Sequence, residues 1–153
     1  IAFKYRMSAV QAALGVAQME RIDELIDYKR KIFGWYHDRL ALVKGLTLNA
    51  EPYGTLNSYW MVTIILDPDL AIDKFQMMKE LDNRNIDSRP FFSPLSTLQA
   101  FDNYPEAKRH VILGNAGHNV AKFGVNLPSG YRVSEEKVDI ITEAIKEIIQ
   151  NHK

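Results

Sequence analysis

Residues 8–42 read SAVQAALGVAQMERIDELIDYKRKIFGWYHDRLAL, and this stretch decides how the chain folds. It predicts one long helix, because Ser8 is a good N-cap and the residues after it are strong helix formers. The first half, up to Met19, has only two strongly polar side chains, Gln11 and Gln18, and is therefore apolar nearly all round. A helix of this kind is expected to be buried on every side.

The second half of this predicted helix, from Glu20 onward, is amphipathic instead. Its apolar residues recur at helical spacing on one face, and its charged residues lie mostly off that face. This half needs only one core to pack against. Since the first half needs cover on its other side too, we expect part of the protein to be missing from this chain. The apolar residues of the amphipathic face are Ile22, Leu25, Ile26, Ile32, Phe33, Tyr36, Leu40 and Val43.

Short strands and helices alternate along the rest of the chain. Lys44-Gly45 is a stop signal for the long helix. Residues 57–66 are rich in aromatic and β-branched residues and form the most strongly predicted strand. This alternation predicts one α+β domain over residues 1–153, not a helical bundle. The other predicted elements are strands at 46–48, 86–89 and 125–127, a helix at 73–83 with Phe75, Met78 and Leu81 facing inward, helical turns at 105–113, a helix at 115–123, and a last helix capped by Ser134 with an apolar stripe of Val138, Ile141, Ile145 and Ile148.

The composition is that of an ordinary globular domain. Lys plus Arg and Asp plus Glu both number 19, so the formal net charge is zero, and nothing indicates a nucleic-acid surface or a basic membrane face. The absence of Cys removes disulfides, thiolate catalysis and Cys-ligated zinc. No apolar run approaches the ~20 residues of a membrane span, and no signal peptide is recognisable, so we expect a cytoplasmic protein. The first residue is Ile, a few residues before a helix cap, which predicts a cut end.

The least ordinary segment is RPFFSPL at 89–95. Its two prolines hold the backbone extended and remove two donors, while the adjacent rings of Phe91 and Phe92 point to different sides. Composition alone favours a rigid surface loop that tucks one ring into the core. The alternative is a loop that forms the wall of a binding cleft.

Motifs of several common active centres are absent from the sequence. The eight glycines are scattered, so there is no phosphate-binding loop, and no Gly-x-Ser-x-Gly nucleophile signature occurs. The four histidines, His37, His110, His118 and His152, lack the spacing of metal ligands, and we predict no metal site. Without further information the chain is a globular domain with no active centre of its own.

Four segments, in order along almost the whole chain, carry a resemblance to a known family. They are FKYRMS at 3–8 with QAALG at 11–15, NSYW at 57–60, RPFFSPL at 89–95 and NLPS at 126–129. Together they resemble the sugar-nucleotide aminotransferases of the DegT/DnrJ/StrS type, and the sequence is most similar to perosamine synthetase-like enzymes within that family.

The resemblance implies a fold and a cofactor. Members of the family use pyridoxal 5′-phosphate (PLP) in the fold of aspartate aminotransferase, as homodimers, and their large N-terminal domain carries the Schiff-base lysine. This chain resembles only the region after that lysine, so residues 1–153 would form the C-terminal small domain: a long N-terminal helix and a small antiparallel sheet flanked by helices. The apolar first helix would pack into the large-domain and dimer contacts. The fragment alone is expected to be inactive.

The resemblance also implies a reaction, in which an amino group moves from glutamate to a keto group of a nucleotide-linked deoxysugar, for polysaccharide or antigen sugar biosynthesis. PLP serves as the electron sink. Lys4 stands where the family commonly has an Asn that reaches the cofactor phosphate across the dimer, although it could equally be a solvated lysine.

The same resemblance suggests the residues that face the substrate. Arg6 would face the anionic substrate or form a structural ion pair, and Phe91 and Phe92 would line the cleft. At Ser96 many relatives have a histidine near the substrate, so its replacement here puts that contact in doubt and suggests a different sugar.

Two alternatives to the aminotransferase remain open. Some relatives are PLP-dependent sugar dehydratases, in which a histidine replaces the Schiff-base lysine of the missing half. The chain could also be a non-catalytic interaction domain. The upstream reading frame would separate the three, and the sugar, the nucleotide and the aminated carbon cannot be read from this chain.

Overall fold

The helical stretch that opens the chain forms two helices. A computed structural model describes residues 5–106, 109 and 116–152, with α1 at Ala9–Met19 and α2 at Ile22–Leu40. Ser8 caps α1 as predicted, in a capping box: its hydroxyl accepts from the Gln11 amide, and the Gln11 side chain accepts from the Ser8 amide. The helical region is thus confirmed, but its continuity is not.

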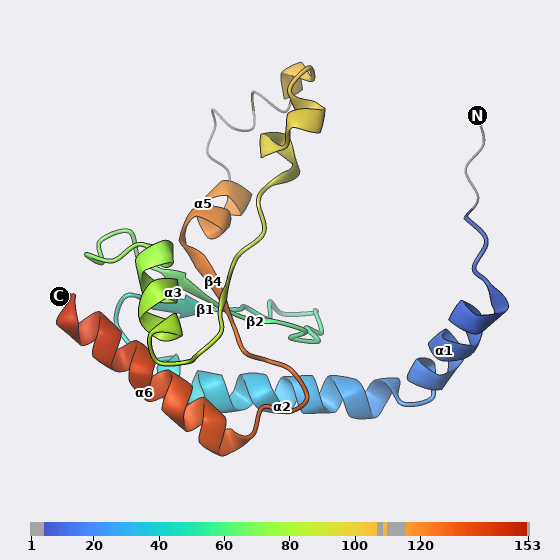
Figure 1. The fold of residues 1–153 in the computed structure, drawn as a ribbon, viewed down its shortest axis with the longest axis horizontal. Helices are drawn as coiled ribbons and strands as arrows, with labels where there is room; N and C mark the ends of the chain where they lie inside the picture. Colours follow the sequence, from blue (N-terminus) through green and yellow to red (C-terminus); the bar gives the residue numbers. More distant parts are fainter. Residues whose placement is uncertain (1–4, 107–108, 110–115, 153) are drawn as a thin grey trace.

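The break lies at Glu20 and Arg21. Arg21 leaves the helical region, with φ −118° and ψ 12°, and its amide bonds to the Gln18 carbonyl, three residues back. The axes of α1 and α2 therefore diverge, and α1 stands away from the sheet (Figure 1). No residue of α1 is buried, so the described part of this chain does not supply the expected cover.

Helix α2 packs on the core through its C-terminal half. Ile32, Phe33, Tyr36 and Leu40 are buried, as the amphipathic pattern predicts. The Tyr36 hydroxyl donates to the Pro128 carbonyl at 2.9 Å, and burial raises the pKa of this phenol. The helix ends at Leu40, ahead of the predicted stop.

Gly45 stands in the turn after this helix. It has φ +90°, a conformation that favours glycine, and a Cβ there would lie 2.7 Å from the Leu70 side chain. The glycine predicted to end the helix therefore serves the turn into the first strand.

Four antiparallel strands form one sheet in the order β1-β2-β4-β3. The central pair aligns Ile64 with Val125, and both side chains are fully buried. The strand predicted at 57–66 begins only at Val62, because Tyr59 has φ +47°, outside the β region. The strands are β1 at Leu46–Leu48, β2 at Val62–Leu66, β3 at Arg89–Pro90 and β4 at Gly124–Leu127.

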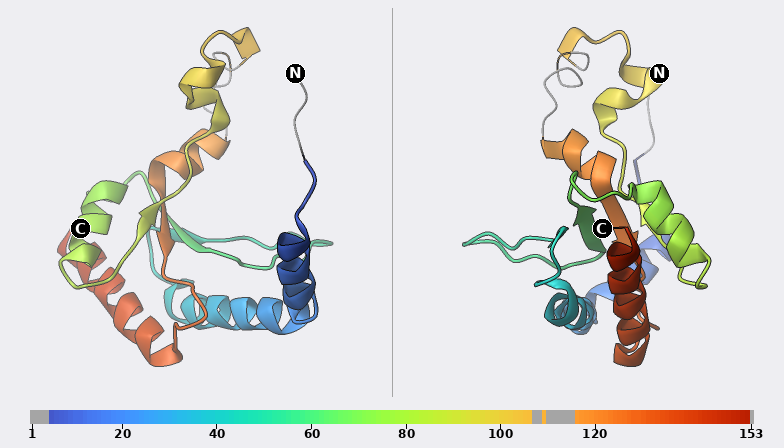
Figure 2. Two further views of the ribbon diagram at one scale, coloured as in Figure 1. Left: turned by 45° about the vertical axis from the view of Figure 1, so that its right-hand side comes forward. Right: turned by 90° about the vertical axis from the view of Figure 1, so that its left-hand side faces the viewer.

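Helices α3 at Lys74–Asp82, α5 at Ala116–Phe123 and α6 at Glu135–Asn151 flank the sheet. Helices α2 and α6 pack on each other, and α3 packs on α6 (Figures 1 and 2). Ser134 caps α6, and the predicted stripe from Val138 to Ile148 is buried. No helix in the described ranges is long and apolar enough to span a membrane.

Two predictions in the middle of the chain need correction. Phe75 on α3 is 64% exposed, and Met77 is buried in its place. Ile72 and Met77 occupy the N′ and N4 positions around the Asp73 cap, so the helix face that carries Met77 turns towards the core. The strand predicted at 86–89 lies at Arg89–Pro90, next to β4. Of the helical turns predicted at 105–113, the described residues 105, 106 and 109 are helical, and the others lie outside the described residues. Short 3-10 turns come before them at Leu95–Thr97 and Gln99–Phe101.

Candidate functional site

Aromatic rings from two different loops meet each other. Trp60, just before β2, stacks on Phe92, just after β3, with ring centroids 6.1 Å apart and planes 9° apart. We call this pair the aromatic stack. Phe91 meets Phe92 edge-on at 5.8 Å. Trp60 is 61% and Phe92 56% exposed, so the stack leaves ring surface open for a planar or apolar ligand.

Phe91 is held against the start of β4. Its amide donates to the Gly124 carbonyl at 3.0 Å, and its side chain is half-buried. A Cβ on Gly124 would lie 2.8 Å from the Phe91 Cβ and 2.5 Å from the Val120 carbonyl oxygen. Phe91 is thus the more buried ring of the pair and Phe92 the exposed one, while the role of this loop as a cleft wall stays a prediction.

Ser96 lies at the far end of the same loop and contacts α5. Its Oγ is 3.2 Å from Nε2 of His118. The spacing of the histidines gave no reason to expect this contact, since it joins residues 22 positions apart. The loop is therefore tied to the α5–β4 segment at both ends, through Phe91 and through Ser96.

The N-terminal candidates are not brought to this loop. Arg6 is exposed and lies ahead of α1. Lys4 lies outside the described residues. Phe91, Phe92 and Ser96 lie on one loop, and no contact between Arg6 and this loop occurs among the described residues.

An ion pair orders the connecting loop, residues 49–61, that leads to Trp60. Arg30 on α2 binds Glu51 through two parallel contacts of 3.0 Å, and the Tyr59 hydroxyl donates to the same carboxylate at 3.0 Å. The Tyr59 ring stacks on Phe33 with centroids 3.6 Å apart. The pKa of Glu51 is lowered to about 2, chiefly by the hydrogen bond from Arg30 and then by that from the Asn57 amide.

This shift predicts how the stability depends on pH. Because the pKa of Glu51 in the folded chain lies below its ordinary value of 4.5, the stabilisation is fully present above pH 4.5 and is lost as the pH falls towards about 2. We expect Glu51→Gln to be less stable than the parent chain at pH 7, with the difference shrinking over this range. Urea unfolding at several pH values measures it. An equal loss of stability for Glu51→Gln in an Arg30→Met background would contradict the pairing.

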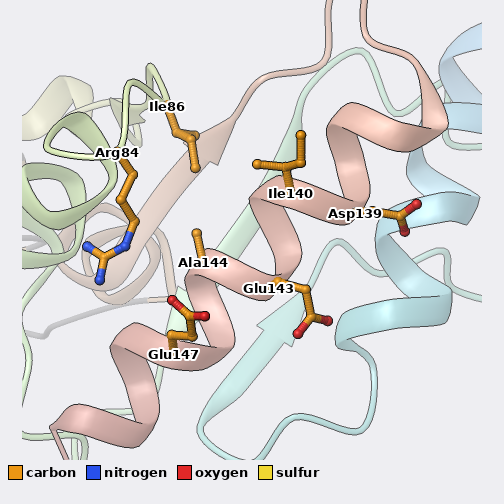
Figure 3. Close-up of a pocket in the computed structure, with 7 residues that line it drawn as sticks. All are labelled: Arg84, Ile86, Asp139, Ile140, Glu143, Ala144 and Glu147. Atoms are coloured by element: carbon orange, nitrogen blue, oxygen red, sulfur yellow. The ribbon is translucent and has the colours of Figure 1, made fainter.

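A separate hollow of the described surface lies between α6 and the turn after α3. Its volume is about 520 Å³, and its charged walls are engaged by neighbours: Arg84 with Glu80 at 2.8 Å and Glu143 with Lys146 at 2.7 Å. Figure 3 shows its lining residues Arg84, Ile86, Asp139, Ile140, Glu143, Ala144 and Glu147, none of which is a predicted site residue. Among the described residues, no group of three or more Asp, Glu or His side chains could hold a metal ion.

Solved structures share this fold. The aminotransferase TlmJ from Streptoalloteichus hindustanus matches with a TM-score of 0.73 at 22% identity, over 94% of this chain and 37% of that one. The Escherichia coli GDP-4-keto-6-deoxy-D-mannose-3-dehydratase with bound hydrated PLP matches with a TM-score of 0.70 at 16% identity, over 88% of this chain and 34% of that one. The likeness establishes a fold that these enzymes use in part of their length.

The chain belongs to the DegT/DnrJ/EryC1/StrS aminotransferase family, whose model matches residues 1–146. GDP-perosamine synthase from Vibrio cholerae is 36% identical over 146 residues, which make up 95% of this chain and 38% of that protein. The matched part is the C-terminal one. The resemblance inferred from the four motifs is thereby confirmed, and the chain spans 38% of the length of this relative.

Proposed function

We propose that this chain is the C-terminal small domain of a PLP-dependent enzyme that transfers an amino group from glutamate to a keto group of a nucleotide-linked deoxysugar, in polysaccharide or antigen sugar biosynthesis. The observation that carries the proposal is the 36% identity with GDP-perosamine synthase from Vibrio cholerae over 146 residues. The complete enzyme would be a cytoplasmic homodimer, with the cofactor-bearing lysine outside this chain.

Each candidate residue would have its own part in the complete enzyme. Lys4 would hold the cofactor phosphate of the other subunit, and Arg6 would face an anionic group of the substrate. The aromatic stack would form an apolar wall against which a planar or apolar face of the substrate packs, supported by the open ring surface of Trp60 and Phe92. Ser96, in contact with His118, would border the same wall. PLP, when bound, supplies the electron sink for amino transfer.

The test uses the full-length protein that contains this chain, with PLP, glutamate and nucleotide-linked keto sugars. We expect 2-oxoglutarate and the amino sugar to form in equal amounts, and the 153-residue chain alone to form neither. Loss of a hydroxyl from the sugar with no amino sugar would indicate the dehydratase instead. No turnover by the full-length protein with any such sugar would favour the non-catalytic interaction domain.

Lys4 allows a direct test of the cofactor role. A lysine that binds the phosphate makes a charge-assisted hydrogen bond worth about 1.5–3 kcal/mol where water is largely excluded. We therefore expect Lys4→Ala to weaken PLP affinity of the full-length enzyme by roughly ten- to a hundredfold, and Lys4→Asn to cost less. PLP retained after dilution measures this, with Lys44→Ala, at an exposed site after α2, as the matched control. Cofactor retention equal to that of the parent enzyme would indicate a solvated lysine.

A further inference from the structure

Lys29 on α2 makes an unusual set of contacts. Its ammonium group donates to the Trp60 carbonyl at 2.9 Å and to the Ser129 carbonyl at 2.5 Å. The Tyr131 ring lies 5.1 Å from the same nitrogen. In the part of the chain that the structure describes, no ion pair includes Lys29, so this half-buried cation binds backbone oxygens instead of a carboxylate.

The two carbonyls belong to the ends of the central strands. Trp60 lies just before β2 and Ser129 just after β4, next to the first ladder pair, Val62 with Leu127. The chain that leaves β4 passes across α2 on its way to α6 (Figure 1). Lys29 therefore ties both strand ends to one helix at a point where the sheet ladder no longer holds them.

Trp60 needs such support because its own side chain is poorly packed. The indole is 61% exposed and stacks on Phe92, which is itself 56% exposed. A ring with so few contacts takes its position largely from the backbone that carries it. At Trp60 the carbonyl of that backbone is held by Lys29, while the preceding residue, Tyr59, has a left-handed φ of +47°.

We propose that Lys29 is a positioning residue of the substrate wall: its ammonium group fixes the backbone at Trp60 and so keeps the aromatic stack in place. The role in substrate binding rests on the proposed function. The role in placing Trp60 does not depend on the proposed function, and this role can be measured on this chain alone. Burial, which lowers the pKa of Lys29, agrees with an ammonium group that has exchanged water for these two carbonyls.

The first experiment is NMR on the 153-residue chain, following cross-relaxation between the Trp60 and Phe92 rings. Lys29→Met keeps the aliphatic stem but removes the donors, and we expect the ring-to-ring signals to be lost. Lys29→Arg can still donate to both carbonyls and should retain them. The matched control is Lys31→Met, an exposed lysine on the same helix whose ammonium lies over Trp35.

Methyl signals of the buried Ile64 and Leu127 show in the same spectra whether each variant is folded. Should Lys29→Met not fold, Lys29→Leu, which also has no donor, replaces it. Ring-to-ring signals unchanged in a folded variant without the ammonium group would overturn the proposal and leave Lys29 a merely stabilising residue.

The second experiment is kinetic and uses the full-length enzyme. We expect Lys29→Met to raise KM for the sugar substrate by about tenfold, with kcat changed by less than about threefold, because the wall binds substrate away from the reacting bond. Loss of the ring-to-ring signals with an unchanged KM would support the positioning of Trp60 by Lys29 and count against the aromatic stack as a substrate wall. Failure of the positioning role of Lys29 and failure of the proposed substrate wall therefore give different results.

Discussion

Gly124→Ala is expected to destabilise the domain by about 2–3 kcal/mol and to displace Phe91 from its place beside β4. The added Cβ would lie 2.5 Å from the Val120 carbonyl oxygen, which belongs to the backbone of α5 and cannot swing away. It would also lie 2.8 Å from the Phe91 Cβ. Relief requires α5 to move from the start of β4, or the Phe91 loop to move from the sheet edge.

Urea unfolding of the chain measures this change in stability. Gly34→Ala is the matched control, because a Cβ at that position in α2 would meet no atom within 4 Å apart from its chain neighbours and the backbone of its own helix. There the same substitution should stabilise the chain by about 0.5–1 kcal/mol, since alanine favours the helix. If the two variants changed stability in the same direction, the close contact at Gly124 would not be the cause of the change.

Ile145→Ala should cost about 3–4 kcal/mol, the largest single-residue effect that we expect in the core. Ile145 is fully buried on α6 and belongs to the hydrophobic core cluster, so truncation leaves a cavity in that core. The same change at Ile140, 65% exposed on the same helix, should alter stability by less than about 0.5 kcal/mol. Denaturant midpoints at a constant m-value provide the measurement. Similar costs at the two sites would contradict the burial of α6 described above.

Local signals predicted most of the elements. Ser8 and Ser134 cap their helices as expected, and the apolar stripe of α6 faces the core. The break between α1 and α2 could not be predicted, because Glu20 and Arg21 are acceptable helix residues and neither position is a Gly or a Pro. The break appears only in the folded chain, where α2 packs on the core and α1 does not.

The candidate site was predicted in part. The Pro-rich loop drew attention to Phe91 and Phe92, and the structure keeps them together. The sequence of this loop gave no indication of Lys29, because the carbonyls that the Lys29 side chain binds are 31 and 100 residues away in sequence. Contacts between a side chain and a distant backbone oxygen leave no residue-type pattern, so the tertiary fold must be known before they can be found.

The separation of α1 from the core has an energetic consequence for how this part of the chain becomes ordered. An isolated helix shorter than about 12–15 residues is marginal in water, and α1 has 11 residues, none of them buried. The Ser8–Gln11 capping box offsets only part of the entropy lost when its backbone is fixed. Most of the stability of α1 must therefore come from whichever surface covers it, so that docking this helix and folding it are one thermodynamic event.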